Sequence, residues 1–108
     1  MGDEVLKQIA ARCSGVIRQA DLFGRYGGEE FVILMPETGM SGAMRLAERL
    51  RLAICEQPFQ TEKGPVPVTI SLGVARSKRS TTNLLQLLGD ADEATYRAKA
   101  AGRNRIQN

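Results

Sequence analysis

The stretch Arg25-Tyr26-Gly27-Gly28-Glu29-Glu30-Phe31-Val32-Ile33-Leu34-Met35 decides how this chain folds. Two consecutive glycines are a strong signal for a hairpin turn, because glycine adopts positive φ without a steric penalty. The apolar run 31–35 predicts a strand after the turn, and residues 22–26 predict its partner before it. Glu29 and Glu30 are then expected at the start of the second strand, on opposite faces of it.

The same stretch has the chemistry of a nucleotide-phosphate site. Glycines let the backbone approach a ligand closely, because no Cβ stands in the way. Carboxylate oxygens are ligands for Mg²⁺, the ion that accompanies nucleoside triphosphates. A plain surface hairpin carries the same residue types, so the rest of the chain has to decide between these interpretations.

Composition indicates a globular domain whose chemistry depends on carboxylates. The chain has 108 residues, of which 43% are hydrophobic and 25% charged, and it contains no histidine. Cys13 and Cys55 are far apart, which argues against structural zinc and a disulfide scaffold and favours a reducing cytoplasm. Without histidine, acid–base or metal chemistry must come from aspartate and glutamate.

The charge balance is compatible with a phosphate-bearing ligand, although a mildly basic surface is more often only a solvated one. The net charge is +3, but aromatic residues are only 5% and tryptophan is absent, so no base-stacking platform is expected. No apolar run approaches the roughly 20 residues that a membrane span needs. We therefore expect neither nucleic-acid binding nor membrane contact from this segment.

Periodicity predicts a helix from Asp3, as N-cap, to about Arg18. A second helix is expected from Thr38 or Ser41 to before Pro58. The clean alternation over 66–75 predicts one long strand, with Pro67 at a sheet edge. Apolar spacing over 84–101 predicts a last helical region, broken at Gly89 and ended by Gly102, before a strand near 105–106.

The order of these elements, α-β-β-α-β-α-(β), predicts an α+β fold. Its natural packing is a two-layer sandwich with helices on one face of a mostly antiparallel sheet.

Four motifs in this order resemble the GGDEF family of diguanylate cyclases, in its Gly-Gly-Glu-Glu-Phe variant. They are Gly2-Asp3-Glu4-Val5-Leu6, the R-x-x-D pair Arg18 and Asp21, the strand 68–75, and the helix and turn 91–104. The resemblance covers residues 2–108 and implies a nucleotidyl-cyclase, ferredoxin-like fold. The family's first strand, with its metal-binding aspartate, and the next helix, with its guanine-reading asparagine, have no counterpart here. We therefore expect residues 1–108 to be a single partial GGDEF domain, its C-terminal portion, without the first central strand and helix.

The resemblance implies condensation of two GTP molecules into cyclic di-GMP and two pyrophosphates, in bacterial second-messenger signalling. Two domains, each holding GTP, face each other, and Mg²⁺ or Mn²⁺ offsets the phosphate charge. We expect this fragment to be inactive, because part of the metal and guanine site is missing. The alternative function is a module that binds cyclic di-GMP.

The resemblance also assigns residues to the GTP site. Glu29 is the expected catalytic carboxylate and metal ligand, and Glu30 supports the site, binds a second ion or is structural. Backbone N–H groups of Gly27 and Gly28 are expected to meet the phosphates. Lys99 and Arg103 are expected at the triphosphate tail, although a basic helix end is also favoured by the helix dipole.

Three further assignments concern guanine and the product. Asp3 is either a guanine reader or the cap of its helix. Arg18 and Asp21 match the family's inhibitory product site, to which Arg49 of a neighbouring domain is a candidate contributor. An Arg–Asp pair at this spacing is otherwise an ordinary surface ion pair.

The missing central strand has a structural consequence. It leaves strand edges with unpaired N–H and C=O groups. We expect a second copy to fill the gap by exchanging or pairing strands, which gives a homodimer. The alternative is a rearrangement of another segment of the same chain.

Overall fold

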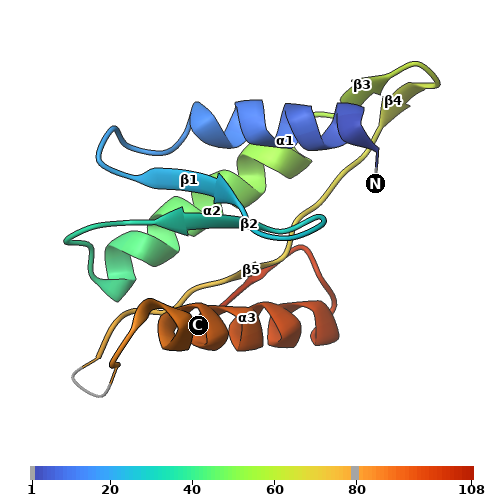
Figure 1. Ribbon diagram of the computed structural model, residues 1–108. Coiled ribbons are helices and arrows are strands. Elements are labelled where there is room, and N and C mark those ends of the chain that lie inside the picture. Colours follow the sequence, from blue (N-terminus) through green and yellow to red (C-terminus); the bar gives the residue numbers. More distant parts are fainter. Residues whose placement is uncertain (1, 79–80) are drawn as a thin grey trace.

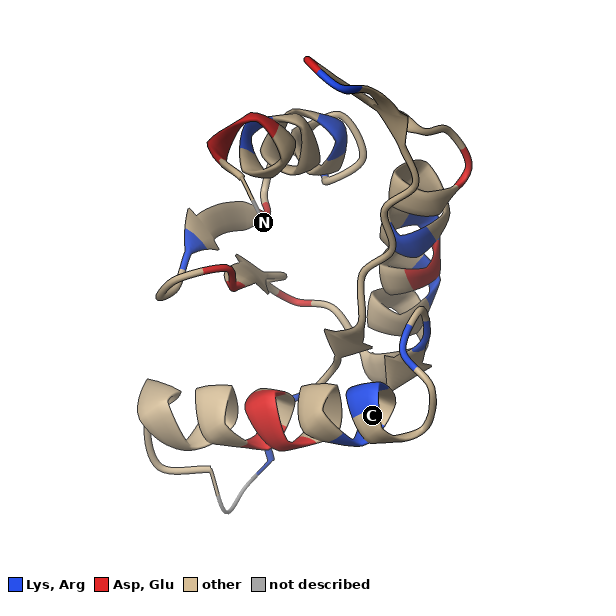
Figure 2. Cartoon of the chain, turned by 90° about the vertical axis from the view of Figure 1, so that its right-hand side faces the viewer, with Lys and Arg blue, Asp and Glu red and all other residues tan. Residues whose placement is uncertain are grey.

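The computed structural model describes residues 2–78 and 81–108 and confirms the α+β class. Figure 1 shows helix α1 on one side of the β1–β2 hairpin and α3 on the other, and Figure 2 shows the same order from a perpendicular direction. The described helices are α1 (Asp3–Ser14), α2 (Met40–Cys55) and α3 (Leu84–Ala100). The described strands are β1 (Leu22–Arg25), β2 (Phe31–Leu34), β3 (Phe59–Thr61), β4 (Gly64–Val66), β5 (Leu72–Gly73) and β6 (Ile106–Gln107).

Helix α1 begins one residue earlier and ends earlier than predicted. Its N-cap is Gly2, so Asp3 lies in the first turn and makes no capping hydrogen bond. A carboxylate is still favoured there by the positive end of the helix dipole. The helix ends at Ser14 instead of Arg18, because the N–H groups of Val16 and Ile17 both bond to the carbonyl of Cys13 and close the last turn.

The other two helices also depart from the predicted ends. Helix α2 starts after Gly39, and the Thr38 hydroxyl bonds to the Pro36 carbonyl at 2.9 Å instead of capping the helix. Helix α3 is capped by Asn83, whose Oδ1 accepts the N–H of Gln86 at 2.9 Å. It continues through Gly89 without a break, and Gly102 follows its end with a φ of 127°, as predicted.

The described strands form three two-stranded pieces. β1 and β2 pair antiparallel, with Leu22 opposite Leu34 and Arg25 opposite Phe31. β3 and β4 form a second antiparallel hairpin that the sequence did not predict, and β5 pairs parallel with β6. The mostly antiparallel pairing is thus confirmed, although the pieces are separate.

The strand predicted over 66–75 is divided. Val66 belongs to β4, Leu72 begins β5, and no main-chain hydrogen bond joins residues 67–71 to another described segment. Their side chains nevertheless follow the predicted alternation, because Val68 is buried and Ile70 packs against the core. Alternation reports which side chains are buried, whereas a strand also needs a neighbour for its backbone.

The main core lies between α1, α2 and the hairpin. Its buried members are Ile9, Cys13, Leu46, Leu50, Ile54, Phe59 and Val68. Burial raises the pKa of the Cys13 thiol to about 11. Phe23, Phe31 and Ile33 pack against this cluster from the hairpin, so the core supports the strands on both sides of the glycine loop.

Arg12 ties α1 to the end of α2. Its Nη1 donates to the carbonyls of Ala53, Ile54 and Gln57 at 3.2, 3.1 and 2.9 Å, and its Nη2 donates to that of Pro58 at 3.1 Å. The guanidinium also lies 3.8 Å from the ring centre of Phe59. A cation therefore satisfies carbonyls at the end of α2, where the helix dipole is negative.

Strand β5 lies directly on α3, and Gly73 makes this contact possible. A Cβ at Gly73 would overlap the carbonyl of Ala91 and both the N–H and hydroxyl of Thr95. Gly73 therefore sets the distance between the strand and the helix. In the part of the chain that the structure describes, no helix is long and apolar enough to cross a membrane.

Candidate functional site

The loop between β1 and β2, residues 26–30, is the centre of the candidate site. The N–H of Tyr26 bonds to the carbonyl of Glu30 at 2.8 Å and closes the loop. Glu29 and Glu30 are both exposed and both precede β2, which starts at Phe31. The prediction that they begin a strand on its two faces is therefore wrong, because the turn takes five residues.

The two glycines of the loop have different roles. Gly27 has a φ of 71°, in the left-handed region that favours glycine, so the turn itself requires this residue. Gly28 does not have a positive φ, and a Cβ there would meet nothing within 4 Å. Its side of the loop is open to close approach by a ligand, which is the property that a phosphate-binding loop needs.

The side chain of Arg25 contacts the loop through the Gly28 carbonyl. Arg25 was not among the predicted site residues. Its Nε and Nη2 both donate to the Gly28 carbonyl, at 3.0 and 2.6 Å. Two charge-assisted bonds to one carbonyl are a strong restraint. The position of Arg25, two residues before the glycine pair, was the available signal, but nothing in the sequence shows that its side chain turns back onto the loop.

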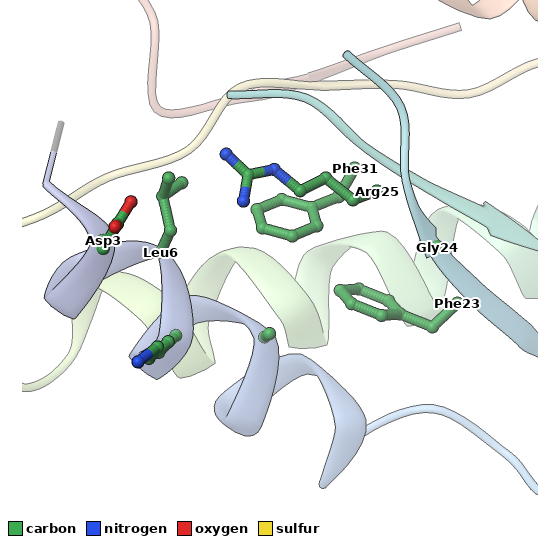
Figure 3. Close-up of a pocket in the computed structure, with 8 residues that line it drawn as sticks. Asp3, Leu6, Phe23, Gly24, Arg25 and Phe31 are labelled. Atoms are coloured by element: carbon green, nitrogen blue, oxygen red, sulfur yellow. The ribbon is translucent and has the colours of Figure 1, made fainter. Parts of the chain in front are cut away.

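A pocket of about 430 Å³ lies between α1 and the hairpin. Figure 3 shows Phe23 and Phe31 on its hairpin side and Leu6 and Asp3 on α1, with the Arg25 side chain extending across it. The two phenylalanine rings are stacked, with centres 5.3 Å apart. The pocket thus has apolar walls, a carboxylate and a guanidinium, a set suited to a flat polar ring such as a nucleobase.

Sequence reasoning assigned Asp3 to this region but missed the apolar wall. Leu6 belongs to the first family motif and Phe23 to a predicted strand, and neither pattern by itself indicates the lining of a pocket. Phe23 and Phe31 occupy positions of one face in the β1–β2 register, where Phe23 pairs with Ile33 and Arg25 with Phe31. Strand alternation on both sides of the turn was the signal for this wall.

The pKa of the Glu29 carboxyl is lowered, and among the described residues the positive charges of Lys99 and then Arg25 contribute to the lowering. Lys99 lies in the last turn of α3, and Arg103 follows the helix with a φ of 62° and an exposed side chain. The end of α3 is therefore close enough to the loop to share its electrostatic field.

The carboxylates fit a magnesium site that is completed by a ligand. Among residues 2–78 and 81–108, no three His, Cys, Asp or Glu side chains come together as a metal cluster. Mg²⁺ is commonly held by one or two carboxylates, with phosphates and water completing its shell. Glu29 and Glu30, adjacent in an exposed loop, match the carboxylate part of that arrangement.

Arg18 and Asp21 meet each other in the turn after α1. Arg18 donates from Nη2 to Asp21 Oδ1 at 2.8 Å, and its main-chain N–H donates to Oδ2 at 2.9 Å. The Asp21 side chain is fully buried, whereas that of Arg18 is 50% exposed and also reaches the hydroxyl of Thr38 at 2.5 Å. Arg49 is exposed on α2 and, among the described residues, bonds to neither. The Asp21 carboxylate is thus fully engaged by Arg18, whereas half of the Arg18 side chain remains exposed to solvent.

Comparisons with known proteins agree with the geometry. The family model for the diguanylate cyclase GGDEF domain matches residues 1–105. The chain is 44% identical over 108 residues to the response regulator PleD of Caulobacter vibrioides, a match that covers 98% of this chain and 24% of PleD. The chain thus spans about a quarter of this relative's length.

Solved structures show the same fold. The active GGEEF domain of a diguanylate cyclase from Vibrio cholerae is 34% identical, with a TM-score of 0.88, covering 97% of this chain and 66% of that one. The GGDEF domain of DgcB from Caulobacter crescentus, in complex with c-di-GMP, is 27% identical with a TM-score of 0.89, over 97% and 63% of the two chains. The chain therefore belongs to the GGDEF family of diguanylate cyclase domains.

Proposed function

We propose that this chain supplies the phosphate-binding loop and part of the base pocket of a GTP site for cyclic di-GMP synthesis. The observation that carries this proposal is the arrangement around one loop. The pocket with Asp3 lies on one side of the hairpin, and the charge of Lys99 reaches Glu29 from the other. A nucleotide whose base enters the pocket has its phosphates at the loop.

Guanine is the base whose edge fits Asp3. Its N1–H and N2–H groups donate hydrogen bonds, and the carboxylate of Asp3 accepts them. Asp3 is not the N-cap of α1, a position that Gly2 occupies, so its carboxylate is not needed to cap its own helix. Leu6 and Phe31 supply apolar contacts for the ring faces. GTP is therefore preferred to ATP, whose base presents a different donor pattern.

In this proposal Glu29 and Glu30 would hold the metal ion to which the phosphates bind. A bound Mg²⁺ or Mn²⁺ would supply charge neutralisation on the phosphate oxygens. The lowered pKa of Glu29 favours the ionised carboxylate, which is the form that binds a cation. Backbone groups at Gly27 and Gly28 approach the phosphates from the open side of the loop.

Lys99 and Arg103 bind the distal phosphates. A charge-assisted hydrogen bond contributes roughly 1.5–3 kcal/mol, so loss of both side chains weakens GTP binding by about two to four orders of magnitude. Isothermal titration calorimetry with GTP and Mg²⁺ measures this in Lys99→Ala/Arg103→Ala. The matched control is Arg45→Ala/Lys63→Ala, which removes the same charge from exposed positions elsewhere. Equal affinities for GTP in the two double variants contradict the proposal.

Synthesis needs two such sites facing each other. The 3′ oxygen of one GTP bonds to the α-phosphorus of the other, the bond to pyrophosphate breaks, and a carboxylate such as Glu29 takes the hydroxyl proton. This chain covers 66% of the solved GGEEF-domain chain, and the resemblance of the motifs implies that the metal-binding aspartate has no counterpart in it. We expect no detectable cyclic di-GMP from the purified 108-residue chain with GTP and Mg²⁺. Clear turnover would contradict this expectation.

A second candidate function is binding of cyclic di-GMP through Arg18, Asp21 and Arg49. The half-exposed guanidinium of Arg18, held in place by buried Asp21, favours it, because a fixed arginine can grip guanine or phosphate. Calorimetry compares the chain with Arg18→Ala/Asp21→Ala, and Arg18→Gln serves as a variant that leaves Asp21 intact. Binding heats equal to those of the unmodified chain in both variants end this idea.

A second copy is the proposed partner for the unpaired strand segment. Residues 67–71 make no main-chain hydrogen bonds to other described segments, and a second copy carries the same open edge. Pairing of identical edges across a two-fold axis gives a closed dimer. A GTP substrate and two free cysteines fit a cytoplasmic location, which fractionation of cells that express the whole protein tests.

A further inference from the structure

Arg25 connects the two parts of the candidate site. It is the last residue of β1 and pairs with Phe31, the first residue of β2, so it stands where the ladder opens into the loop. Its side chain bonds to the Gly28 carbonyl through Nε and Nη2. The same side chain lines the base pocket and extends toward Asp3 and Leu6 of α1 (Figure 3). One guanidinium thus touches both the loop and the pocket.

The two bonds to Gly28 restrain the position of Glu29. The peptide between Gly28 and Glu29 is planar, so a fixed carbonyl also fixes the plane from which the Glu29 backbone continues. The direction in which the Glu29 side chain leaves the loop therefore depends on Arg25. Glycines at 27 and 28 leave the loop intrinsically flexible, and an external restraint has correspondingly more effect there.

Arg25 keeps further hydrogen-bond donors while it holds the loop. A guanidinium has five N–H donors, and the bonds to Gly28 use two of them. The remaining N–H donors of the Arg25 guanidinium border the pocket. A ligand that extends from the pocket to the loop therefore lies beside them.

We propose that Arg25 is a positioning residue that sets the loop geometry for Glu29 and couples occupancy of the base pocket to binding of phosphate and metal at the loop. The inference rests on the proposed function, because it takes the loop to be the phosphate-binding part of a GTP site. The inference adds that the planar geometry of the Arg25 guanidinium matters as well as its positive charge. Lysine, a point charge on a flexible stem, cannot reproduce that geometry.

The first test needs no nucleotide. Amide hydrogen exchange of Tyr26, whose N–H bonds to the Glu30 carbonyl and closes the loop, is followed by nuclear magnetic resonance in the unmodified chain, Arg25→Lys and Arg25→Gln. The expected result is exchange accelerated by about tenfold in the loop and unchanged exchange in α2, as the loss of a charge-assisted bond implies. Arg45→Lys is the matched control, because Arg45 is exposed and bonds only to Ser41 among the described residues. Unchanged loop exchange in both Arg25 variants overturns the inference.

The second test separates geometry from charge. Titration with GTP, with and without Mg²⁺, gives the factor by which the metal strengthens binding. In Arg25→Lys this factor is expected to fall to the value measured for Glu29→Gln. The double variant Arg25→Lys/Glu29→Gln is expected to bind GTP no more weakly than Glu29→Gln alone, because both substitutions act through the Glu29 carboxylate. Additive losses, or full rescue by lysine, overturn the inference. If the unmodified chain binds no GTP, the proposed function fails, and the exchange measurement alone decides whether Arg25 holds the loop.

Discussion

At the level of single residues, the two members of the R-x-x-D pair contact each other. The sequence predicts that Asp21 takes part in product binding, and in the structure its carboxylate is buried and bonded to the side chain and main chain of Arg18. Its position at the end of a tight turn explains this, because the turn brings Arg18 and Asp21 together before any ligand arrives. The spacing predicted that the two residues act together and could not tell which of them faces outward.

Asp21 gives the folded state a defined acid sensitivity. The pKa of Asp21 is lowered from its ordinary value of 3.8, first by the side-chain hydrogen bond from Arg18, with burial opposing the shift. At a pH between the pKa of Asp21 in the unfolded chain and its lower pKa in the folded chain, the unfolded chain binds more protons than the folded one. The free energy of unfolding therefore decreases as the pH falls through this range. Chemical denaturation is expected to show full stability above about pH 3.8 and a loss as the pH falls through the lower pKa of the folded state.

The control for this prediction is a pair of isosteric changes. Asp21→Asn is expected to lower the free energy of unfolding at neutral pH and to flatten its decline below pH 3.8. Asp92→Asn, at an exposed position of α3, is expected to leave the decline unchanged. An unchanged acid slope in Asp21→Asn contradicts the assignment.

At the level of elements, positions were easier to predict than ends and partners. The period-3.6 pattern located all three described helices, whereas α1 stops early, where the N–H groups of Val16 and Ile17 both bond to the Cys13 carbonyl. The β3–β4 hairpin escaped prediction because Phe59 is its one buried side chain, which is too little to produce an alternating pattern. Arg25 escaped for a related reason, since its contact depends on the loop conformation.

Arg12 is the element-scale contact with the largest expected effect. Replacement by alanine removes four hydrogen bonds from a cation to carbonyls near the end of α2 and the contact with the Phe59 ring. Arg12→Ala is expected to lower the free energy of unfolding by about 2 kcal/mol or more. Urea denaturation measures this value, and Arg45→Ala is the exposed arginine control. A difference below about 0.5 kcal/mol between the two variants contradicts the prediction.

Two glycines predict opposite effects of the same substitution. Gly73→Ala places a Cβ against the backbone of Ala91 and Thr95, so it is expected to destabilise the chain by about 1–3 kcal/mol. Gly89→Ala adds a methyl group in open space inside α3 and is expected to stabilise it by about 0.5–1 kcal/mol. Thermal unfolding of both variants checks the signs. A melting temperature that rises in Gly73→Ala contradicts the close contact between β5 and α3.

At the level of the whole molecule, the motifs predicted the family and the class of fold. The described strands form three separate two-stranded pieces, and β2 and β5 are not joined in one sheet. The sequence could not show how the open edges arrange, because alternation in 66–75 reports burial alone. The link between pocket and loop depends on tertiary packing of α1 against the hairpin, which no local pattern encodes.

The proposed pairing of copies makes a prediction about mass and exchange. Light scattering is expected to show a dimer whose fraction rises with concentration, and the amides of Thr69 and Ser71 are expected to become protected from exchange as it forms. Thr69→Pro removes one donor from the edge and is expected to shift the equilibrium toward the monomer. Thr69→Val, which keeps the N–H donor at the same position, serves as the control. A monomer at all concentrations, with no protection at residues 67–71, argues against the pairing.

The short parallel contact of β5 with β6 has a consequence for what can join the chain there. The N–H groups of Leu72 and Val74 donate to the carbonyls of Arg105 and Gln107, so the N–H groups of these even-numbered residues face β6. Successive residues of an extended chain alternate in direction, and those of Thr69 and Ser71 therefore face the opposite edge. An incoming strand on that edge leaves β6 undisturbed. Assembly through that edge is accordingly compatible with the β5–β6 pair, so the contact between Leu72 and Ile106 is expected to be the same in the monomer and in the dimer.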